Sequence, residues 1–222
     1  MRTPVTRKAL AQHFTYNWWK YLLLILFSVF AVNMLYTVTA YHAPADKKIS
    51  FYIYGYADTE GLDAYMEEVR KNELPDMEEM RSFTIMNEGY YGSMQLTTYL
   101  AAGEGNLYLL PRDQFISMAS EGAFVPLESD AELMAFFDEA GISLQSGWRK
   151  NTEEGETHLY GIPQTKLPGL TRYAWADDGG YLGVAVTGQN VENTMTFLRI
   201  LCRDMINEPD LPEQTAEEAE SK

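Results

Sequence analysis

The stretch AAGEGNLYLLPRDQF, residues 101–115, contains the pattern that decides the fold. A run of small residues ends at Gly103, and glycine is the usual residue just after a helix. Four apolar residues at positions 107–110 follow between turn residues, as expected of a strand that is buried on both faces. Arg112 and Asp113 come directly afterwards, so this strand is predicted to bring a charged pair to the edge of a sheet.

The segments around this stretch alternate between strand and helix patterns. Strands are predicted over residues 47–56, 81–87, 106–110 and 181–186. Helices are predicted to start at Asp58 or Thr59, to cover residues 93–102 and 112–120, and to start again at Ser129 or Asp130 and at Asn190. Residues 142–180 show no regular period. This order predicts an α/β domain over residues 46–206, with a parallel sheet between two layers of helices.

An uncharged apolar segment, residues 21–41, precedes this domain and contains a single strongly polar residue, Asn33. A helix of this length spans the roughly 30 Å hydrocarbon core of a bilayer. Residues 1–20 hold four basic residues and no acid, which predicts a cytoplasmic N-terminus and a domain outside the cell membrane. A cleaved signal peptide is the alternative, because small residues at 38–40 and 43–45 fit a cleavage site; the length of the segment favours an anchor.

The rest of the chain is strongly acidic. Without the four basic residues of positions 1–20, 13 of the 17 basic residues remain against 32 acids, a balance of −19. Such a surface is a poor partner for nucleic acid, because phosphate contacts need Lys and Arg. Residues 207–222 form an acidic tail that is predicted to be disordered. The single cysteine, Cys202, lies on an apolar helical stripe and is expected to be a buried structural thiol.

Three segments of the chain resemble the sugar-binding type of bacterial extracellular solute-binding proteins, which serve ABC importers. They are residues 101–127, the LYGIP segment at 159–163, and VAVTGQNVENTMTFLRIL at 184–201. The family is about twice as long, with two lobes that close on a ligand, and it usually has an acid where this chain has Asn106. Only about 20 residues separate GIP from the returning strand, too few for a second lobe. The resemblance therefore implies a single lobe fixed to the membrane.

Ligands of open parallel sheets bind beyond the carboxyl ends of the strands, and aromatic and polar residues follow these ends here. The candidate binding residues are Tyr56, Asp58, Glu88, Tyr90, Tyr91, Arg112, Asp113 and Trp175. Trp148, Tyr173 and Trp175 are candidates to close over such a site. Each group of candidates also has an explanation without a ligand. Asp58 is a good helix cap, and Arg112 with Asp113 can simply begin a helix. The aromatic residues suit a protein interface equally well.

No arrangement in the sequence is typical of catalysis. His13, His42 and His158 are scattered, and no metal-binding, dinucleotide-binding or nucleophile motif occurs, so no cofactor and no metal is expected. Two hypotheses remain. The first is a non-catalytic binding module for a solute, such as a sugar or peptide, with a role in transport. The second is an interaction subunit that docks on another membrane or cell-envelope protein.

Overall fold

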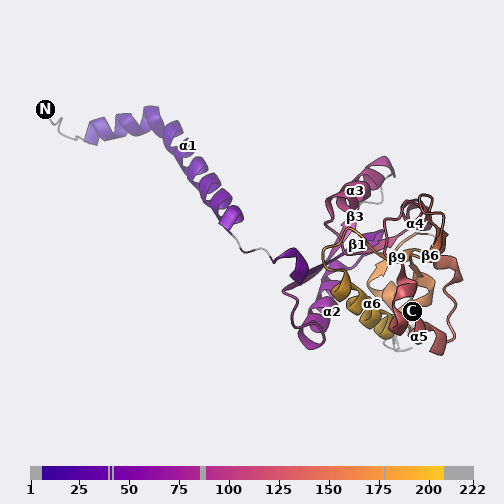
Figure 1. Ribbon diagram of the computed structural model, residues 1–222. Coiled ribbons are helices and arrows are strands. Elements are labelled where there is room, and N and C mark those ends of the chain that lie inside the picture. The colour runs from indigo at the N-terminus through magenta and orange to yellow at the C-terminus, as the bar shows by residue number, and fades with distance from the viewer. Residues whose placement is uncertain (1–6, 40, 42, 86–88, 178, 208–222) are drawn as a thin grey trace, which may run out of the picture. The chain divides into compact units, whose positions relative to one another are not determined.

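The computed structural model describes residues 7–39, 41, 43–85, 89–177 and 179–207, and the chain divides into two compact units (Figure 1). The first unit is Met1–His42 and the second, called the body below, is Ala43–Lys222. Glu88 and the predicted disordered tail beyond Asn207 lie outside the described residues.

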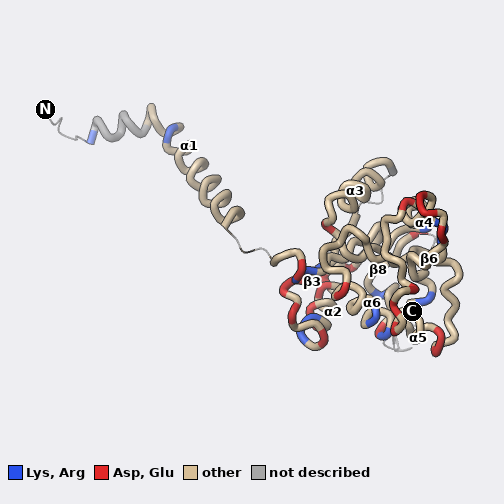
Figure 2. Tube along the Cα trace, in the orientation of Figure 1, with Lys and Arg blue, Asp and Glu red and all other residues tan. Residues whose placement is uncertain are grey.

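The first unit contains one long helix, α1 (Arg7–Thr39). Its segment Thr15–Thr39 has 25 residues and buries none of them, and it is long and apolar enough to cross a membrane. A signal sequence near the N-terminus has the same properties, so the choice between anchor and signal stays a prediction. Figure 2 shows the stretch of α1 after its last lysine without any charge.

The body is built on a five-stranded sheet with the order β3-β1-β4-β9-β7. These strands are β1 (Lys48–Tyr54), β3 (Glu79–Ile85), β4 (Leu107–Leu110), β7 (Ile162–Pro163) and β9 (Tyr181–Val184). The predicted parallel pairing is confirmed for β1 with β3 and with β4. The prediction is wrong for β9, which runs antiparallel to both β4 and β7. The connection from β7 to β9 contains no long crossover helix, and such a connection returns the chain in the opposite direction.

Helices cover both faces of this sheet (Figure 1). The side chains of β1 alternate between the two faces, and each face packs on its own core. Ile49, Phe51 and Ile53 face the larger core, which contains residues of α2 (Thr59–Asn72), α5 (Ala131–Glu139) and α6 (Val191–Met205). Tyr52 and Tyr54 face the smaller core, with residues of α3 (Gly89–Ala102) and α4 (Arg112–Ser120). The body therefore has the helix–sheet–helix layers that the sequence predicts.

Residues 142–180 contain more structure than their sequence indicates. Two small antiparallel pairs form, β2 (Tyr56–Ala57) with β8 (Ala174–Trp175) and β5 (Trp148–Lys150) with β6 (Thr157–Leu159). Three short 3₁₀ helices also lie in this range: η3 (Gln145–Gly147), η4 (Gln164–Lys166) and η5 (Pro168–Arg172). Two more lie earlier in the body, η1 (Ala45–Lys47) and η2 (Leu127–Ser129).

The sequence predicts that Cys202 within α6 is a buried thiol and that Asn190 just before it is a helix cap. Cys202 is fully buried, as expected, and burial raises the pKa of its thiol. Asn190 precedes α6 but its side chain makes no capping hydrogen bond, contrary to expectation. Its amide instead donates to the carbonyl of Lys48 at 3.4 Å, because this buried position lies against the start of β1.

Candidate functional site

The carboxyl ends of β1 and β4 are covered by the body's own chain. Gly55 directly follows β1, and a Cβ atom at this position would lie 2.3 Å from the carbonyl oxygen of Trp175. A Cβ atom on Gly180 would lie 2.5 Å from the Cβ of Ala176 and 2.9 Å from the carbonyl of Leu110, the last residue of β4. The segment around β8 therefore packs on the edge where the sequence predicts an open ligand site.

A buried glutamine holds this covering segment in place. Gln164 is 3% exposed, and its amide donates to the carbonyl of Ala174 at 2.6 Å. Its side-chain oxygen accepts from the backbone N–H of Ala176 at 3.1 Å, and its own N–H donates to the carbonyl of Gly180. Ala174 and Ala176 are fully buried. The covering segment, residues 164–177 with Gly179 and Gly180, is thus fixed to the core by buried side chains at several positions.

The cover leaves one aromatic pair exposed. Tyr56 and Trp175 are directly opposite each other in the antiparallel pair β2–β8. Tyr56 is 66% exposed and Trp175 is 55% exposed. Because side chains opposite each other on paired strands lie close together, the two form one exposed surface. Asp58 lies next to this pair, where its N–H donates to the carbonyl of Tyr173. The structure therefore brings two of the predicted aromatic residues together, from segments far apart in the sequence.

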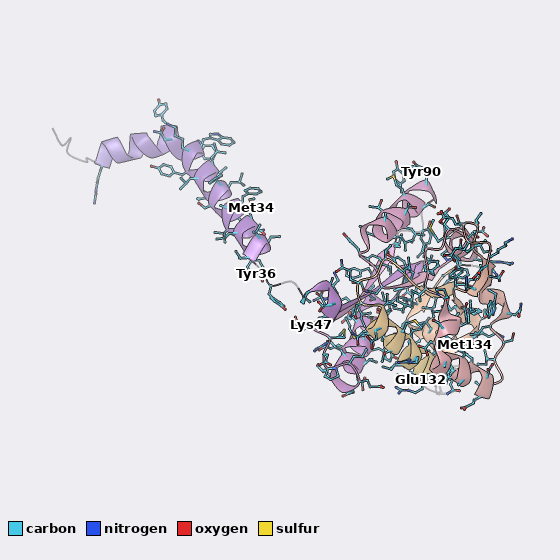
Figure 3. All side chains as sticks on the ribbon, in the orientation of Figure 1. Met34, Tyr36, Lys47, Tyr90, Glu132 and Met134 are labelled. Atoms are coloured by element: carbon cyan, nitrogen blue, oxygen red, sulfur yellow. The ribbon has the colours of Figure 1, made fainter. Side chains whose placement is uncertain are left out.

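Tyr90 and Tyr91 form a second exposed aromatic group at the start of α3 (Figure 3). They are 78% and 72% exposed, and their ring centres lie 6.2 Å apart in an edge-to-face arrangement. Met94, one turn further along, is also 52% exposed. These side chains belong to the first turns of α3, and Glu88, which precedes them, lies outside the described residues.

Among the charged candidates, Asp58 has a structural role, and Arg112 and Asp113 form no ion pair with a described residue. The carboxylate of Asp58 accepts from the backbone N–H of Gly61 at 3.1 Å and caps α2. Arg112 and Asp113 begin α4 with exposed side chains, and neither forms an ion pair with a residue in the described part of the chain. Asp58 at the N-cap of α2 and Asp113 in the first turn of α4 both suit the helix dipole, so the alternative explanation fits both residues.

The two other candidates for closing the site lie elsewhere. Tyr173 is half-buried and stacks on Tyr65, with ring centres 5.9 Å apart. Trp148 is half-buried against the larger core. Neither ring is free to fold over the carboxyl edge of the sheet without leaving these contacts.

The Tyr65–Tyr173 stack instead lines a hollow of about 480 Å³ that the sequence does not predict. Tyr65 donates to the carboxylate of Asp204 at 3.0 Å, and burial followed by this acid raises the pKa of Tyr65. Arg203, beside Asp204, forms two hydrogen bonds with Glu73, of 2.7 and 3.0 Å. The lining comes mostly from α2, η5 and α6. Figure 2 shows acidic and basic residues on α2 and α6. No sequence signal identifies this hollow, since its lining combines core and surface residues of elements that lie far apart in the sequence.

His158 is the one histidine whose side chain the structure describes in the body. Its Nδ1 lies 2.6 Å from the carboxylate of Glu128, which also accepts from the backbone N–H of Leu159. This contact joins β6 to η2 and is structural. Within the described ranges, no group of three or more His, Cys, Asp or Glu side chains has the geometry of a metal site.

Comparison with known proteins gives distant similarities. No protein-family model matches the sequence, and no curated protein matches it. An extracellular solute-binding protein family 1 member from Alicyclobacillus acidocaldarius is similar in structure, with 20% identity and a TM-score of 0.37 over 52% of this chain and 27% of its own. An uncharacterized protein from Listeria monocytogenes has 16% identity and a TM-score of 0.40, over 53% of this chain and 28% of its own.

The chain therefore spans less than a third of the length of either neighbour. Both TM-scores are below 0.5, so the resemblance to solute-binding proteins and membership of that family stay predictions.

Proposed function

We propose that this chain is a non-catalytic, membrane-anchored module that docks on another membrane or cell-envelope protein through Tyr56 and Trp175. The observation that carries the proposal is that this pair is exposed while the backbone of Trp175, Ala176 and Gly180 packs on the ends of β1 and β4 beneath it. A filled edge leaves little room for a solute, whereas exposed Tyr and Trp side chains are typical of protein interfaces.

The anchor in this proposal is α1, with its N-terminus in the cytoplasm. Four basic residues lie in positions 1–20, and only Lys47 and Lys48 follow the apolar segment closely. The aromatic residues Trp18, Trp19 and Tyr21 mark the predicted inner boundary. The body then lies outside the cytoplasmic membrane. Protease added to intact cells should remove the body and leave the N-terminal segment protected; a body that is cleaved only after lysis would contradict this orientation.

Docking is tested by crosslinking in native membranes, followed by purification of the full chain and quantification of the crosslinked proteins. The double variant Tyr56→Ala and Trp175→Ala should lose the specific partner. A matched double variant of the other aromatic group, Tyr90→Ala and Tyr91→Ala, should retain it. Equal recovery of the same partner by the wild type and by the Tyr56/Trp175 variant would refute a role for this pair.

A small polar solute, such as a sugar or short peptide, remains a second candidate because of the hollow beside Tyr65. Its volume of about 480 Å³ falls within the usual range of ligand sites, and its two tyrosines and several charged groups suit a polar ligand. Thermal-shift screening of the full chain with sugars and peptides tests this function. Stabilisation that disappears in Tyr65→Ala would support it, and no stabilisation at millimolar ligand would refute it.

A further inference from the structure

Three aliphatic hydroxyl groups in the apolar part of α1, those of Ser28, Thr37 and Thr39, donate their hydrogen bonds within the helix. Ser28 donates to the carbonyl of Leu24 at 2.8 Å, and Thr39 donates to that of Leu35 at 2.7 Å. Thr37 donates to the carbonyl of Asn33 at 2.9 Å. Each bond reaches back four residues, the usual way in which a hydroxyl is accommodated in a helix surrounded by lipid.

The side-chain amide of Asn33 differs from these hydroxyls. It is exposed and makes no hydrogen bond with any residue that the structure describes. Asn33 lies twelve residues after Tyr21, which is roughly 18 Å along a helix, well inside a hydrocarbon core of roughly 30 Å. An amide with two donors and one acceptor is costly there unless another polar group meets it.

Asn33 also lies on a seam suited to helix pairing. Leu23, Leu26, Phe30, Asn33 and Thr37 follow one another at alternating spacings of three and four residues, and all of them line one shallow groove on α1. This spacing is that of the a and d positions of a left-handed helix pair. A single asparagine at such a position is known to fix the register and number of paired helices.

We propose that two copies of this chain pair in parallel along this seam, with the amide of Asn33 in one copy bonded to that in the other. The inference rests on the proposed membrane anchor. Copies with the same orientation place Asn33 at the same depth, and an amide is complementary to a second amide because each provides a donor and an acceptor. The pair satisfies the acceptor and one of the two donors of each amide. Figure 3 shows the side chains of this part of α1 projecting outward around the helix.

The test uses the full chain in phosphatidylcholine vesicles, with donor or acceptor dyes on the N-terminus. Energy transfer is measured as lipid dilutes the protein, which gives the strength of pairing. Asn33→Leu should weaken pairing roughly 3- to 30-fold, the range found for hydrogen bonds between helices in membranes. Asn33→Gln keeps the amide and should restore most of the pairing, and Ser28→Ala, which removes an internally satisfied hydroxyl, should change it less than about twofold.

Equal pairing of wild type and Asn33→Leu would overturn the proposal, as would a wild-type chain without energy transfer at the highest protein content. Extraction of the same vesicles with alkaline carbonate separates this failure from failure of the anchor. A chain that stays in the vesicles but does not pair refutes only the pairing. A chain that carbonate removes refutes the anchor and the pairing together.

Discussion

Replacement of Gln164 by alanine tests whether the covering segment closes the carboxyl edge of the sheet. The side chain makes two hydrogen bonds to this segment, one to the carbonyl of Ala174 and one from the N–H of Ala176. Both partners belong to fully buried residues, so Gln164→Ala leaves a buried acceptor and a buried donor unpaired.

The expected loss of stability follows from these two groups. If water enters the space and pairs with both, the loss is about 1–3 kcal/mol; if both stay dry, it is about 2–6 kcal/mol. We expect a value near 2–3 kcal/mol, since the removed side chain leaves room for water beside the carbonyl. For a body of this size the melting temperature should fall by roughly 4–12 °C.

Urea unfolding of the full chain in detergent measures the loss, and hydrogen exchange at residues 174–176 locates it. Gln145→Ala, the same substitution at an exposed position of η3, is the matched control and should change stability by less than about 0.5 kcal/mol. A loss below about 0.5 kcal/mol for Gln164→Ala, with unchanged exchange at 174–176, would show that the segment is not held by this side chain.

Three further predictions concern the roles assigned to other residues. Asp58→Ala should destabilise the body by about 1 kcal/mol through loss of the α2 cap, whereas Asp113→Ala should have less than half this effect; equal urea midpoints for both variants would count against the cap. Burial raises the pKa of Tyr52 from its ordinary 10.0 to about 12 and also raises that of the Cys202 thiol, so the folded state keeps protons that the unfolded chain releases. Stability should therefore fall as pH rises above about 9, by up to about 1.4 kcal/mol per pH unit and group; urea unfolding at increasing pH checks it, and a flat profile up to about pH 11 contradicts it. Trp175→Ala should change the urea midpoint little, because the ring is 55% exposed; a loss above about 2 kcal/mol would mean that this ring is structural and not a docking residue.

The main elements of the fold could be predicted because each has an apolar run or period that is bounded by Gly, Pro or a capping residue. Residues 107–110 form β4 and residues 112–120 form α4, as the opening stretch indicates. The direction of β9 could not be read in this way, because an apolar run looks the same in a parallel and in an antiparallel neighbour. The strands of residues 142–180 contain two or three residues each, too few to show a period.

The candidate site was predictable only as a set of residue types at strand ends. The pairing of Tyr56 with Trp175 depends on a two-residue contact between distant segments, and neither segment indicates the other. The filling of the edge depends on Gln164 and on the close approach of Gly55 and Gly180 to the cover. A glycine that permits such an approach has the same sequence signature as a glycine in an ordinary turn.

The most direct test of the docking function is site-specific photocrosslinking in native membranes. Benzoylphenylalanine is placed at Trp175 in the full chain and, as a control, at Glu139, an exposed position at the end of α5. We expect one discrete protein adduct from position 175, none from position 139, and loss of the adduct when Tyr56→Ala is added. No adduct from position 175, or the same adducts from both positions, would contradict a docking surface at Tyr56 and Trp175.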